Sequence, residues 1–583
     1  MKFPVATIGT LLVSLVSAQS DTINLPDVNS TVVQKHLLSR SNLISVERRQ
    51  RQDYLFRQNL SSVAQQADAI VKALRQEEID DFWRVPGTLA NNDTDERFAG
   101  EMFPRARPLI NETKLWDVVR HMPKGALLHA HLSAMLPYGI LIDTVLDTEG
   151  MVVSADQDVS TELKRENASI WFSHVNHTVA TDAPSIHSAD YVPNTEIPVT
   201  VAAATFPGGR DGFVDFVKSK ITVQPEDSIR HELGVDEIWR KFQTAFGPAG
   251  SMMSYEPIVR KFYQQLFSRL AADGINWVEI RAGGSSGNLV HEGDEDADPD
   301  LDVWWDVLLE ELQAFQDSEA GADFWGARVI WSDSRGKDTA SLTKSMSIAL
   351  ERKRRFPDLF SGYDVVAQED LGRTLADMTP EFLWFQEQAE ASNLTIPFFF
   401  HAGETLGDGN STDLNLFDAV LFGTRRIGHG FSLYKHPKLI NEVIENAIMV
   451  EVCPISNEVL RLATDILHHP LPAMIAHGIP TAISNDDPAI LGQNAAGLSY
   501  DFYQTIQGFD NIGLAGLGAL AHNSIRWSNF EDQNDVDWIR DIDLAEHGTG
   551  IKAQRLQEWN EKWEQFCQWV VDTYGEQFAT AEI

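Results

Sequence analysis

Four short polar motifs in this 583-residue chain combine residue types that bind metals and move protons. They are His129-Ala130-His131, His401-Ala402-Gly403-Glu404, Gly428-His429-Gly430 and Asn485-Asp486-Asp487-Pro488. Neutral imidazoles and a carboxylate suit a borderline metal such as zinc. A further carboxylate beside a metal-activated water can transfer protons. Together the motifs indicate metal-assisted hydrolysis.

Each motif also has a plain structural alternative. Two histidines two residues apart share one face of a strand, but they can be satisfied core side chains. Glu404 can cap a helix, and His429 can be a core side chain in a tight glycine turn. Asp486 and Asp487 can belong to an ordinary turn before proline, although adjacent carboxylates repel unless something pairs them. The functional interpretation depends on all four motifs meeting at one place.

Eight β-rich runs alternate with helical runs from residue 120 onward, and each motif ends one of these runs. The strand candidates are residues 124–132, 275–282, 327–334, 361–368, 396–404, 425–433, 448–457 and 480–488, with helices expected at 257–273, 303–317 and 380–391. Alternating strands and helices imply parallel strands with right-handed crossovers. Eight such units predict an α/β fold, a (β/α)8 (TIM) barrel, whose C-terminal face carries the active site.

Other parts of the chain lie outside this rhythm. Residues 1–18 have the charge, apolar stretch and small-residue cleavage site of a secretory signal peptide. Residues 19–115 are expected to form a helical region, with helices at 33–57 and 61–84. The barrel is assigned to 116–583, with an inserted subdomain at about 150–230. The insertion is predicted because the long stretch between the first two strand candidates is not expected to be a structureless loop in a compact domain. Helices at 515–528 and 552–574 complete the chain.

Composition limits the partners and the compartment. The net charge of −38 and the pI near 4.7 exclude nucleic acid and anionic membranes as natural partners. Eight N-x-S/T sequons behind the signal sequence predict a secreted, extracellular glycoprotein. The only cysteines, Cys453 and Cys567, exclude a disulfide framework and cysteine-rich zinc sites. Cys453 is expected to be a buried thiol within a strand.

The four motifs, in this order and spacing, resemble the adenosine deaminase family of the amidohydrolase superfamily. They are most similar to its secreted branch, the adenosine-deaminase-related growth factors (adenosine deaminase 2). Supporting stretches are residues 122–125, 330–335, 369–370 and 451–457, and the resemblance covers about residues 110–530. It implies hydrolytic deamination of adenosine, with 2′-deoxyadenosine and AMP as further candidates, by one Zn²⁺ per chain. It also implies a homodimer formed through the N-terminal region.

The resemblance assigns roles residue by residue. His129, His131, His401 and Asp486 match the zinc ligands. Glu404 matches the group that binds the purine and protonates its N1, His429 matches the residue that orients the attacking water, and Asp487 matches the carboxyl group that hydrogen-bonds N7.

Two departures from the branch bear on specificity and on partners. The branch has an aspartate directly after the second histidine, where this chain has Leu132. Losing that negative charge suggests that a 5′-phosphate is tolerated. The insertion also lacks the cysteines of the branch, which weakens any inference of receptor binding.

Two other functions stay open. One is an extracellular growth-factor-like binding protein with little catalysis. The other is a different mononuclear amidohydrolase; the absence of lysine from residues 363–370 favours a single metal over a pair bridged by a carboxylated lysine. Stoichiometric metal would separate an enzyme from a binding module.

Overall fold

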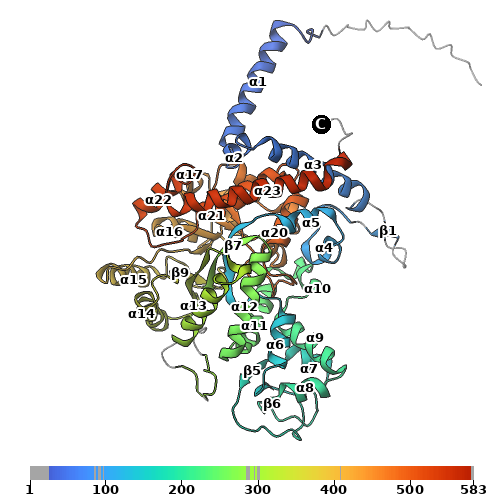
Figure 1. The fold of residues 1–583 in the computed structure, drawn as a ribbon, viewed down its shortest axis with the longest axis vertical. Helices are drawn as coiled ribbons and strands as arrows, with labels where there is room; N and C mark the ends of the chain where they lie inside the picture. The colour runs from blue at the N-terminus through green and yellow to red at the C-terminus, as the bar shows by residue number, and fades with distance from the viewer. Residues whose placement is uncertain are drawn as a thin grey trace, which may run out of the picture. The chain divides into compact units, whose positions relative to one another are not determined.

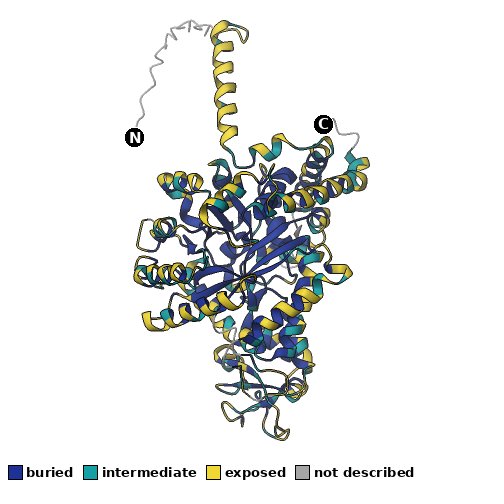
Figure 2. Cartoon of the chain, turned by 60° about the vertical axis from the view of Figure 1, so that its left-hand side comes forward, coloured by how far each residue is buried: buried dark blue, intermediate teal, exposed yellow. Residues whose placement is uncertain are grey.

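The computed structural model describes residues 25–83, 87–88, 94–95, 97–283, 289–294, 296–298, 302–407 and 409–578. The chain divides into two compact units, residues 1–50 and 51–583. The predicted signal peptide, residues 1–18, lies outside the described residues. The described part of the first unit consists mainly of helix α1 (Thr31–Gln50), in which every side chain is at least partly exposed (Figure 2).

The second unit opens with helices that pack on the C-terminal end of the chain. The predicted helix 33–57 is divided, since α1 ends at Gln50 and α2 (Tyr54–Gln58) follows a turn in which Asp53 accepts hydrogen bonds from Arg51 and Arg57. The next helix, α3 (Ser62–Glu78), is capped by the Ser61 hydroxyl. Its apolar face packs on α21 (Gly513–Arg526) and α23 (Ile551–Phe578).

Eight parallel strands form the barrel that the sequence predicts. They are β3 (Gly125–His131), β7 (Ile275–Ala282), β8 (Gly326–Ser334), β9 (Phe360–Val366), β10 (His401–Ala402), β11 (Arg426–His429), β12 (Met449–Val452) and β13 (Thr481–Ile483). Two four-stranded sheets, β3-β7-β8-β9 and β10-β11-β12-β13, are joined by parallel bridges between Tyr363 and Phe398 and between Ala130 and Asp486. The second bridge brings the first strand against the residues after the last, which closes the barrel.

Helices surround the strands, each burying one face against them (Figures 1 and 2). They include α12 (Glu256–Ala272), α13 (Asp302–Gln316), α14 (Thr339–Arg355), α15 (Thr379–Ala391), α16 (Asn415–Leu421), α17 (Pro437–Glu445) and α19 (Leu471–Ala476). In α12 the buried side chains Ile258, Phe262 and Leu266 recur at helical spacing. This helical spacing of apolar residues explains how α12 packs one face against the barrel.

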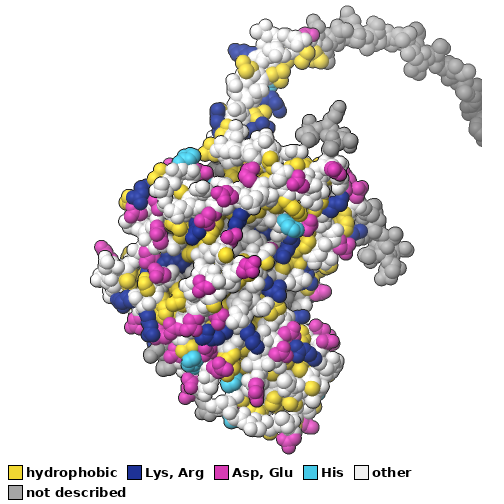
Figure 3. Space-filling model, viewed as in Figure 1, with side chains coloured by type: hydrophobic (Ala, Val, Ile, Leu, Met, Phe, Trp, Pro, Cys, Tyr) yellow, Lys and Arg dark blue, Asp and Glu magenta, His cyan; other side chains and the backbone are white. Residues whose placement is uncertain are grey.

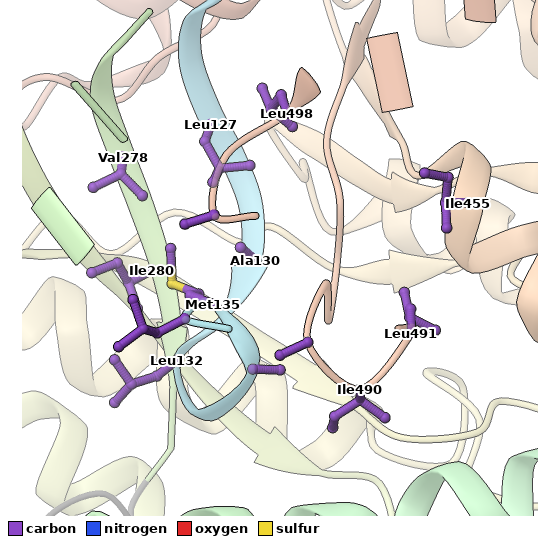
Figure 4. Close-up of a cluster of buried hydrophobic side chains, with 14 of the residues drawn as sticks. Leu127, Ala130, Leu132, Met135, Val278, Ile280, Ile455, Ile490, Leu491 and Leu498 are labelled. Atoms are coloured by element: carbon purple, nitrogen blue, oxygen red, sulfur yellow. The ribbon is translucent and has the colours of Figure 1, made fainter. Parts of the chain in front are cut away.

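The first strand is irregular just before its motif. A register shift separates Leu127 from Ala130 in the pairing of β3 with β7. Figure 4 shows both residues in one buried apolar cluster with Val278 and Ile280 of β7. Strict alternation would have placed Leu127 on the same face as His129, so the irregularity lets Leu127 pack with the apolar cluster while His129 faces the site.

The later strands are shorter than predicted because turns interrupt their apolar runs. Strand β11 ends at His429, because Gly430 takes a left-handed conformation and Phe431–Lys435 forms a short helix, η6. Strand β12 ends at Val452, since Pro454 begins α18 (Pro454–Val459). Cys453 is buried, as expected, but it follows the strand instead of lying within it. Neither cysteine is in a disulfide.

The residues between β3 and β7 form a separate small sheet and several helices. Strands β4 (Met151–Ala155), β5 (Ile170–His174) and β6 (Ile197–Pro198) are antiparallel, and they are followed by α8 (Val199–Thr205), α9 (Gly209–Ile221), α10 (Pro225–Ser228) and α11 (Val235–Met252). Arg461, beyond the end of β12, donates hydrogen bonds to the carbonyl oxygens of Asp227 and Gly234. This part of the insertion is thereby held to a loop at the C-terminal face of the barrel.

Charge and hydropathy at the surface agree with the composition. Figure 3 shows acidic and basic side chains interspersed over one face of the molecule. Within the described residues, no helix combines the length and the apolar character needed to cross a membrane.

Candidate metal centre and active site

Three histidines and one aspartate converge at the C-terminal face of the barrel. His129 and His131 come from β3, His401 comes from β10, and Asp486 follows β13. One possible ligand atom from each residue lies within 4.8 Å of every other. Asp486 Oδ1 is 3.1 Å from His131 Nε2 and 3.3 Å from His129 Nε2.

Buried carboxylates fix the orientation of two of these rings. His129 Nδ1 lies 2.9 Å from Glu451 Oε2, and His401 Nδ1 lies 2.6 Å from Asp364 Oδ2. An ionised carboxylate only accepts hydrogen bonds, so each Nδ1 carries the proton. The Nε2 lone pairs then face the cluster, and His129 Nε2 has no hydrogen-bond partner among the described residues. Carboxylates in this position are typical partners of metal-binding histidines.

Two arginines join these carboxylates inside the barrel. Arg281 lies 2.8 Å from Asp364 and 2.7 Å from Glu451, while Arg426 lies 2.5 Å from Glu451 and 2.8 Å from Glu279. All five side chains are fully buried. Burial opposes their ionisation, but Arg281 and Arg426 hold the pKa of Glu451 well below its ordinary value. A buried ion-pair network therefore lies next to the cluster.

The protonation states at the cluster suit a cation. Burial lowers the pKa of His401 to about 3 and also lowers the pKa of His131, so both rings are neutral near pH 7. Burial opposes ionisation of Asp486, but the histidine rings around it hold its pKa well below the ordinary value. Three imidazole nitrogens and one carboxylate are a donor set that fits a single zinc ion.

Three further titratable side chains lie beside the cluster. Glu404 Oε1 is 3.6 Å from His429 Nδ1, and His429 Nε2 is 4.0 Å from Asp486 Oδ2. Burial, together with Asp486 and Glu369, raises the pKa of Glu404 well above its ordinary value. Burial and the neighbouring Asp486 do the same to Asp487. Glu404 and Asp487 each have a carboxyl oxygen without a partner among the described residues, so both can donate a proton to a ligand.

The turn that carries Glu404 is held by a second carboxylate. Glu369, after β9, accepts hydrogen bonds from the backbone N–H groups of Gly403, at 3.3 Å, and Glu404, at 2.7 Å. The side-chain amide of Asn415 donates to Glu369 at 2.7 Å. On the other side, Arg335 donates to the carbonyl oxygen of His401. These contacts set the path of the chain between His401 and Glu404.

Backbone strain is concentrated at this face. His429 has φ of 60° and Asp486 has φ of 58°, a left-handed conformation that non-glycine residues seldom adopt. Residues in such conformations cost about 1–3 kcal/mol each and persist where the surroundings impose them. Gly428 allows the close approach of β11, because a Cβ there would lie 2.9 Å from His129 Cε1.

The structure brings together every site residue that the sequence predicts. His129, His401, Glu404, His429, Asp486 and Asp487 are buried, and the side chain of His131 is 14% exposed. Four residues that hold them were not predicted to have a role: Asp364, Glu369, Glu451 and Arg281. Their signal is a charged residue inside or just after an otherwise apolar strand, as in Val278-Glu279-Ile280-Arg281 and Met449-Val450-Glu451-Val452.

Comparison with known proteins agrees with this geometry. Residues 222–544 match the family model described as adenosine deaminase. The chain is 32% identical to an adenosine deaminase of Lutzomyia longipalpis (78% of this chain, 80% of the relative) and 32% identical to adenosine deaminase 2-A of Danio rerio (75% and 81%). It is 30% identical to adenosine deaminase 2 of Homo sapiens (80% and 82%).

Solved structures match at lower identity. An adenine deaminase from Arthrobacter aurescens is 17% identical with a TM-score of 0.45, over 75% of this chain and 99% of that chain. A zinc-bound amidohydrolase from Burkhoderia ambifaria is 14% identical with a TM-score of 0.45, over 77% and 95%. The family model and the sequence relatives carry the assignment: the chain belongs to the adenosine deaminase family, in its adenosine deaminase 2 branch, and is a hydrolytic deaminase acting on a carbon–nitrogen bond.

Proposed function

We propose that this protein is a secreted, zinc-dependent enzyme that converts adenosine and water to inosine and ammonia. The observation that carries the proposal is the placement of the buried Glu404 carboxyl group beside the cluster of His129, His131, His401 and Asp486, with Oε1 unpartnered among the described residues and its pKa raised by burial. That arrangement supports the proposal because candidate metal ligands and a candidate proton donor lie together in one buried space.

The chain's own residues divide the chemistry between them. When bound, zinc acts as a Lewis acid that makes water nucleophilic near neutral pH. Glu404 delivers its proton to purine N1, which makes C6 electrophilic, and then accepts a proton from the attacking water. His429 orients that water, and the protonated carboxyl group of Asp487 donates a hydrogen bond to N7. The C6–O bond forms, Glu404 passes the proton taken from water to the amino group, and the C6–N bond breaks as ammonia leaves. The proton that remains on the C6 oxygen then goes to Glu404, which restores its carboxyl group.

AMP is proposed as a second substrate because of Leu132. This side chain is buried in the apolar cluster that also contains Met135 and Ile280 (Figure 4). It places no negative charge after the second histidine, so it does not repel a 5′-phosphate there. If AMP is deaminated far more slowly than adenosine in the absence of phosphatase, this part of the proposal is wrong.

The first test is an ultraviolet assay of the purified protein with adenosine, 2′-deoxyadenosine and AMP, each with and without a chelator. We expect absorbance near the adenine maximum to fall, and the chelator to abolish the change. A protein that contains zinc but alters none of the three purines would point to another amidohydrolase substrate. A protein with neither zinc nor turnover would point to the growth-factor-like binding protein.

Glu404→Gln tests the proton-transfer role directly. Its kcat should fall by about 10²–10⁴-fold, the usual contribution of general acid–base catalysis, while zinc content and thermal midpoint stay unchanged. Glu387→Gln is the matched control, since Glu387 lies on the exposed face of α15. Turnover of the Glu404 variant at the wild-type rate would remove Glu404 from the mechanism.

Secretion and dimer formation are proposed on separate grounds. The seven sequon asparagines within the described residues are all exposed, namely Asn29, Asn59, Asn111, Asn167, Asn176, Asn393 and Asn410. Exposure of the acceptor side chain is required for a glycosylated, exported protein. A shift in electrophoretic mobility after enzymatic deglycosylation of protein from the culture medium tests this. The homodimer is proposed to form through α1, whose apolar side chains are exposed.

A further inference from the structure

A chain of buried polar groups leads from the backbone of α19 to the ring of His429. The backbone N–H of Leu471 donates to His469 Nδ1 at 3.0 Å. His469 Nε2 lies 2.9 Å from Asn457 Oδ1, and Asn457 Nδ2 lies 3.3 Å from His429 Nδ1. All three side chains are buried.

The direction of every hydrogen bond follows from the first donor. A backbone N–H can only donate, so His469 Nδ1 must be the acceptor. Burial lowers the pKa of His469 to about 3, which keeps the ring neutral. A neutral imidazole carries one proton, so that proton is on His469 Nε2 and is donated to Asn457.

This fixes the amide of Asn457 and, through it, the ring of His429. The oxygen of the amide faces His469, so the NH₂ group faces His429 and donates to its Nδ1. The neutral ring must then carry its proton on Nε2. Glu404 Oε1 is the other group near His429 Nδ1, but at 3.6 Å it lies beyond hydrogen-bonding distance.

The Nε2–H group of His429 points toward the reacting region. It has no hydrogen-bond partner among the described residues, and Asp486 Oδ2 is 4.0 Å away. We propose that Asn457 and His469 are positioning residues that hold His429 in the Nε2–H tautomer, so that His429 donates a hydrogen bond to the attacking water. This inference rests on the proposed deaminase function and deepens it.

The tautomer assigns the proton transfers in the reaction. A ring that already carries a proton on Nε2 has no lone pair there to accept one from water. The proton that water loses as the C6–O bond forms therefore goes to Glu404, and His429 stabilises the oxygen by donation throughout. Glu404 therefore transfers the protons, and His429 holds the attacking oxygen next to C6.

Asn457→Asp reverses the constraint with almost no change in shape. A carboxylate at this position accepts from His429 and so draws the proton to Nδ1, leaving Nε2 as an acceptor. We expect kcat to fall by about 10²-fold or more, within the range for misplaced general acid–base groups, with KM and zinc content near the wild-type values.

The tautomer can be read without turnover. Protein with ¹⁵N-labelled histidine, both zinc-loaded and chelator-treated, gives separate nitrogen resonances for protonated and unprotonated ring nitrogens, and the His429 signals are those lost in His429→Asn. We expect Nε2–H in the wild type and Nδ1–H in Asn457→Asp. Wild-type protein with the proton on Nδ1 would overturn the inference, as would Asn457→Asp with an unchanged tautomer, whatever its kcat.

His469 supplies a second, milder test in case Asn457→Asp does not fold. His469→Gln keeps an N–H donor for Asn457 and should retain most of kcat, whereas His469→Leu removes the donor and should lower kcat at least about tenfold. His468→Gln, at the exposed neighbouring histidine, is the control. Equal kcat values for the Gln and Leu variants would contradict the inference. If the wild-type enzyme deaminates no purine, the proposed function is wrong. The tautomer of His429 can still be measured in that case, so the two proposals are tested separately.

Discussion

Residue types at strand ends were enough to predict the ligand cluster, but not the residues that support it. His129, His401 and Asp486 are conspicuous because their side chains rarely follow apolar runs without a reason. Glu451 and Arg281 lie inside such runs, and their value depends on partners from other strands. A single charged residue in a strand does not reveal which distant residue neutralises it. Only the closed barrel brings these charges together.

Replacing Glu369 tests how strongly turnover depends on the exact position of Glu404. Glu369→Gln replaces one of two accepting oxygens with an NH₂ group that faces the donors Gly403 N–H and Asn415. The turn carrying Glu404 should shift, and a displacement of about 1 Å at a catalytic group costs about 10²-fold. We expect kcat to fall by about 10–100-fold, with zinc content unchanged by metal analysis.

Asp370→Asn is the matched control for that experiment. Asp370 is the adjacent acid, and its contact is with the side chain of Thr405, at 2.7 Å, not with the backbone of the turn. The Asp370→Asn substitution removes one negative charge from the same loop as Glu369→Gln does. A comparable loss in both variants would show that charge, and not the hold on Gly403 and Glu404, explains the effect.

Glu78, far from the site, predicts how stability depends on pH. Its carboxyl group ends α3 and accepts from Leu115 N–H, and burial raises its pKa from 4.5 to about 7. The folded state holds this proton more tightly than the unfolded chain. Its contribution is therefore complete below about pH 4.5 and is lost as pH rises to about 7, for a total of about 3 kcal/mol.

Glu78→Gln should remove this dependence. A glutamine keeps an acceptor for Leu115 and has nothing to ionise, so the variant should gain stability over the wild type as pH rises through that window. Urea unfolding of both proteins at several pH values measures the difference. Glu77→Gln, at a 37% exposed neighbour, is the control. Parallel curves for Glu78→Gln and the wild type would refute the assignment.

At the scale of elements, the order and type of the strands could be predicted, while several ends could not. Apolar runs continue past the true end of β11 and β12, since residues 431–433 and 454–455 are buried in short helices instead of strands. Residues 396–400 pair only through the isolated bridge at Phe398, and the regular strand β10 is confined to His401–Ala402. A hydrophobic run predicts that its residues are buried but not where the strand ends. Here the left-handed turn at Gly430 ends β11, and Pro454, which begins α18, follows the end of β12.

The closeness of β11 to the first strand yields a prediction for Gly428. In Gly428→Ala the new methyl group would lie 2.9 Å from His129 Cε1 and 3.3 Å from His401 Cα. The ring of His129 must move off Glu451, and losing such support lowers metal affinity by about 10–100-fold. Competition with a chromogenic chelator measures the affinity.

Gly247→Ala in α11 separates this effect from a general cost of adding a methyl group. A Cβ at Gly247 meets open space, and alanine is the better helix former by about 0.5–1 kcal/mol. The control should bind zinc normally and be slightly more stable. Unchanged zinc affinity in Gly428→Ala would mean that β11 can yield without disturbing His129.

At the scale of the whole molecule, the site and the first unit are separable. Every residue of the cluster and of its supporting network lies in the unit of residues 51–583. The first unit contributes α1, a helix of 20 residues in which Leu38 and Leu43 are more than 60% exposed. An isolated helix of this length is marginal in water and gains its stability from packing. The exposed leucines are the basis for proposing that α1 packs against a second copy of the chain.

Removing residues 19–50, so that the protein begins at Arg51 once the proposed signal peptide is cleaved, tests whether α1 contacts a second copy. We expect the full protein to be a dimer by light scattering and the truncated protein, beginning at Arg51, to be a monomer. Because the cluster is complete without α1, kcat/KM for adenosine should stay within about threefold, well under the 1.4 kcal/mol that a tenfold change represents. A truncated protein that still dimerises would place the contact in the second unit, and one that loses turnover with its zinc retained would show that α1 shapes the site.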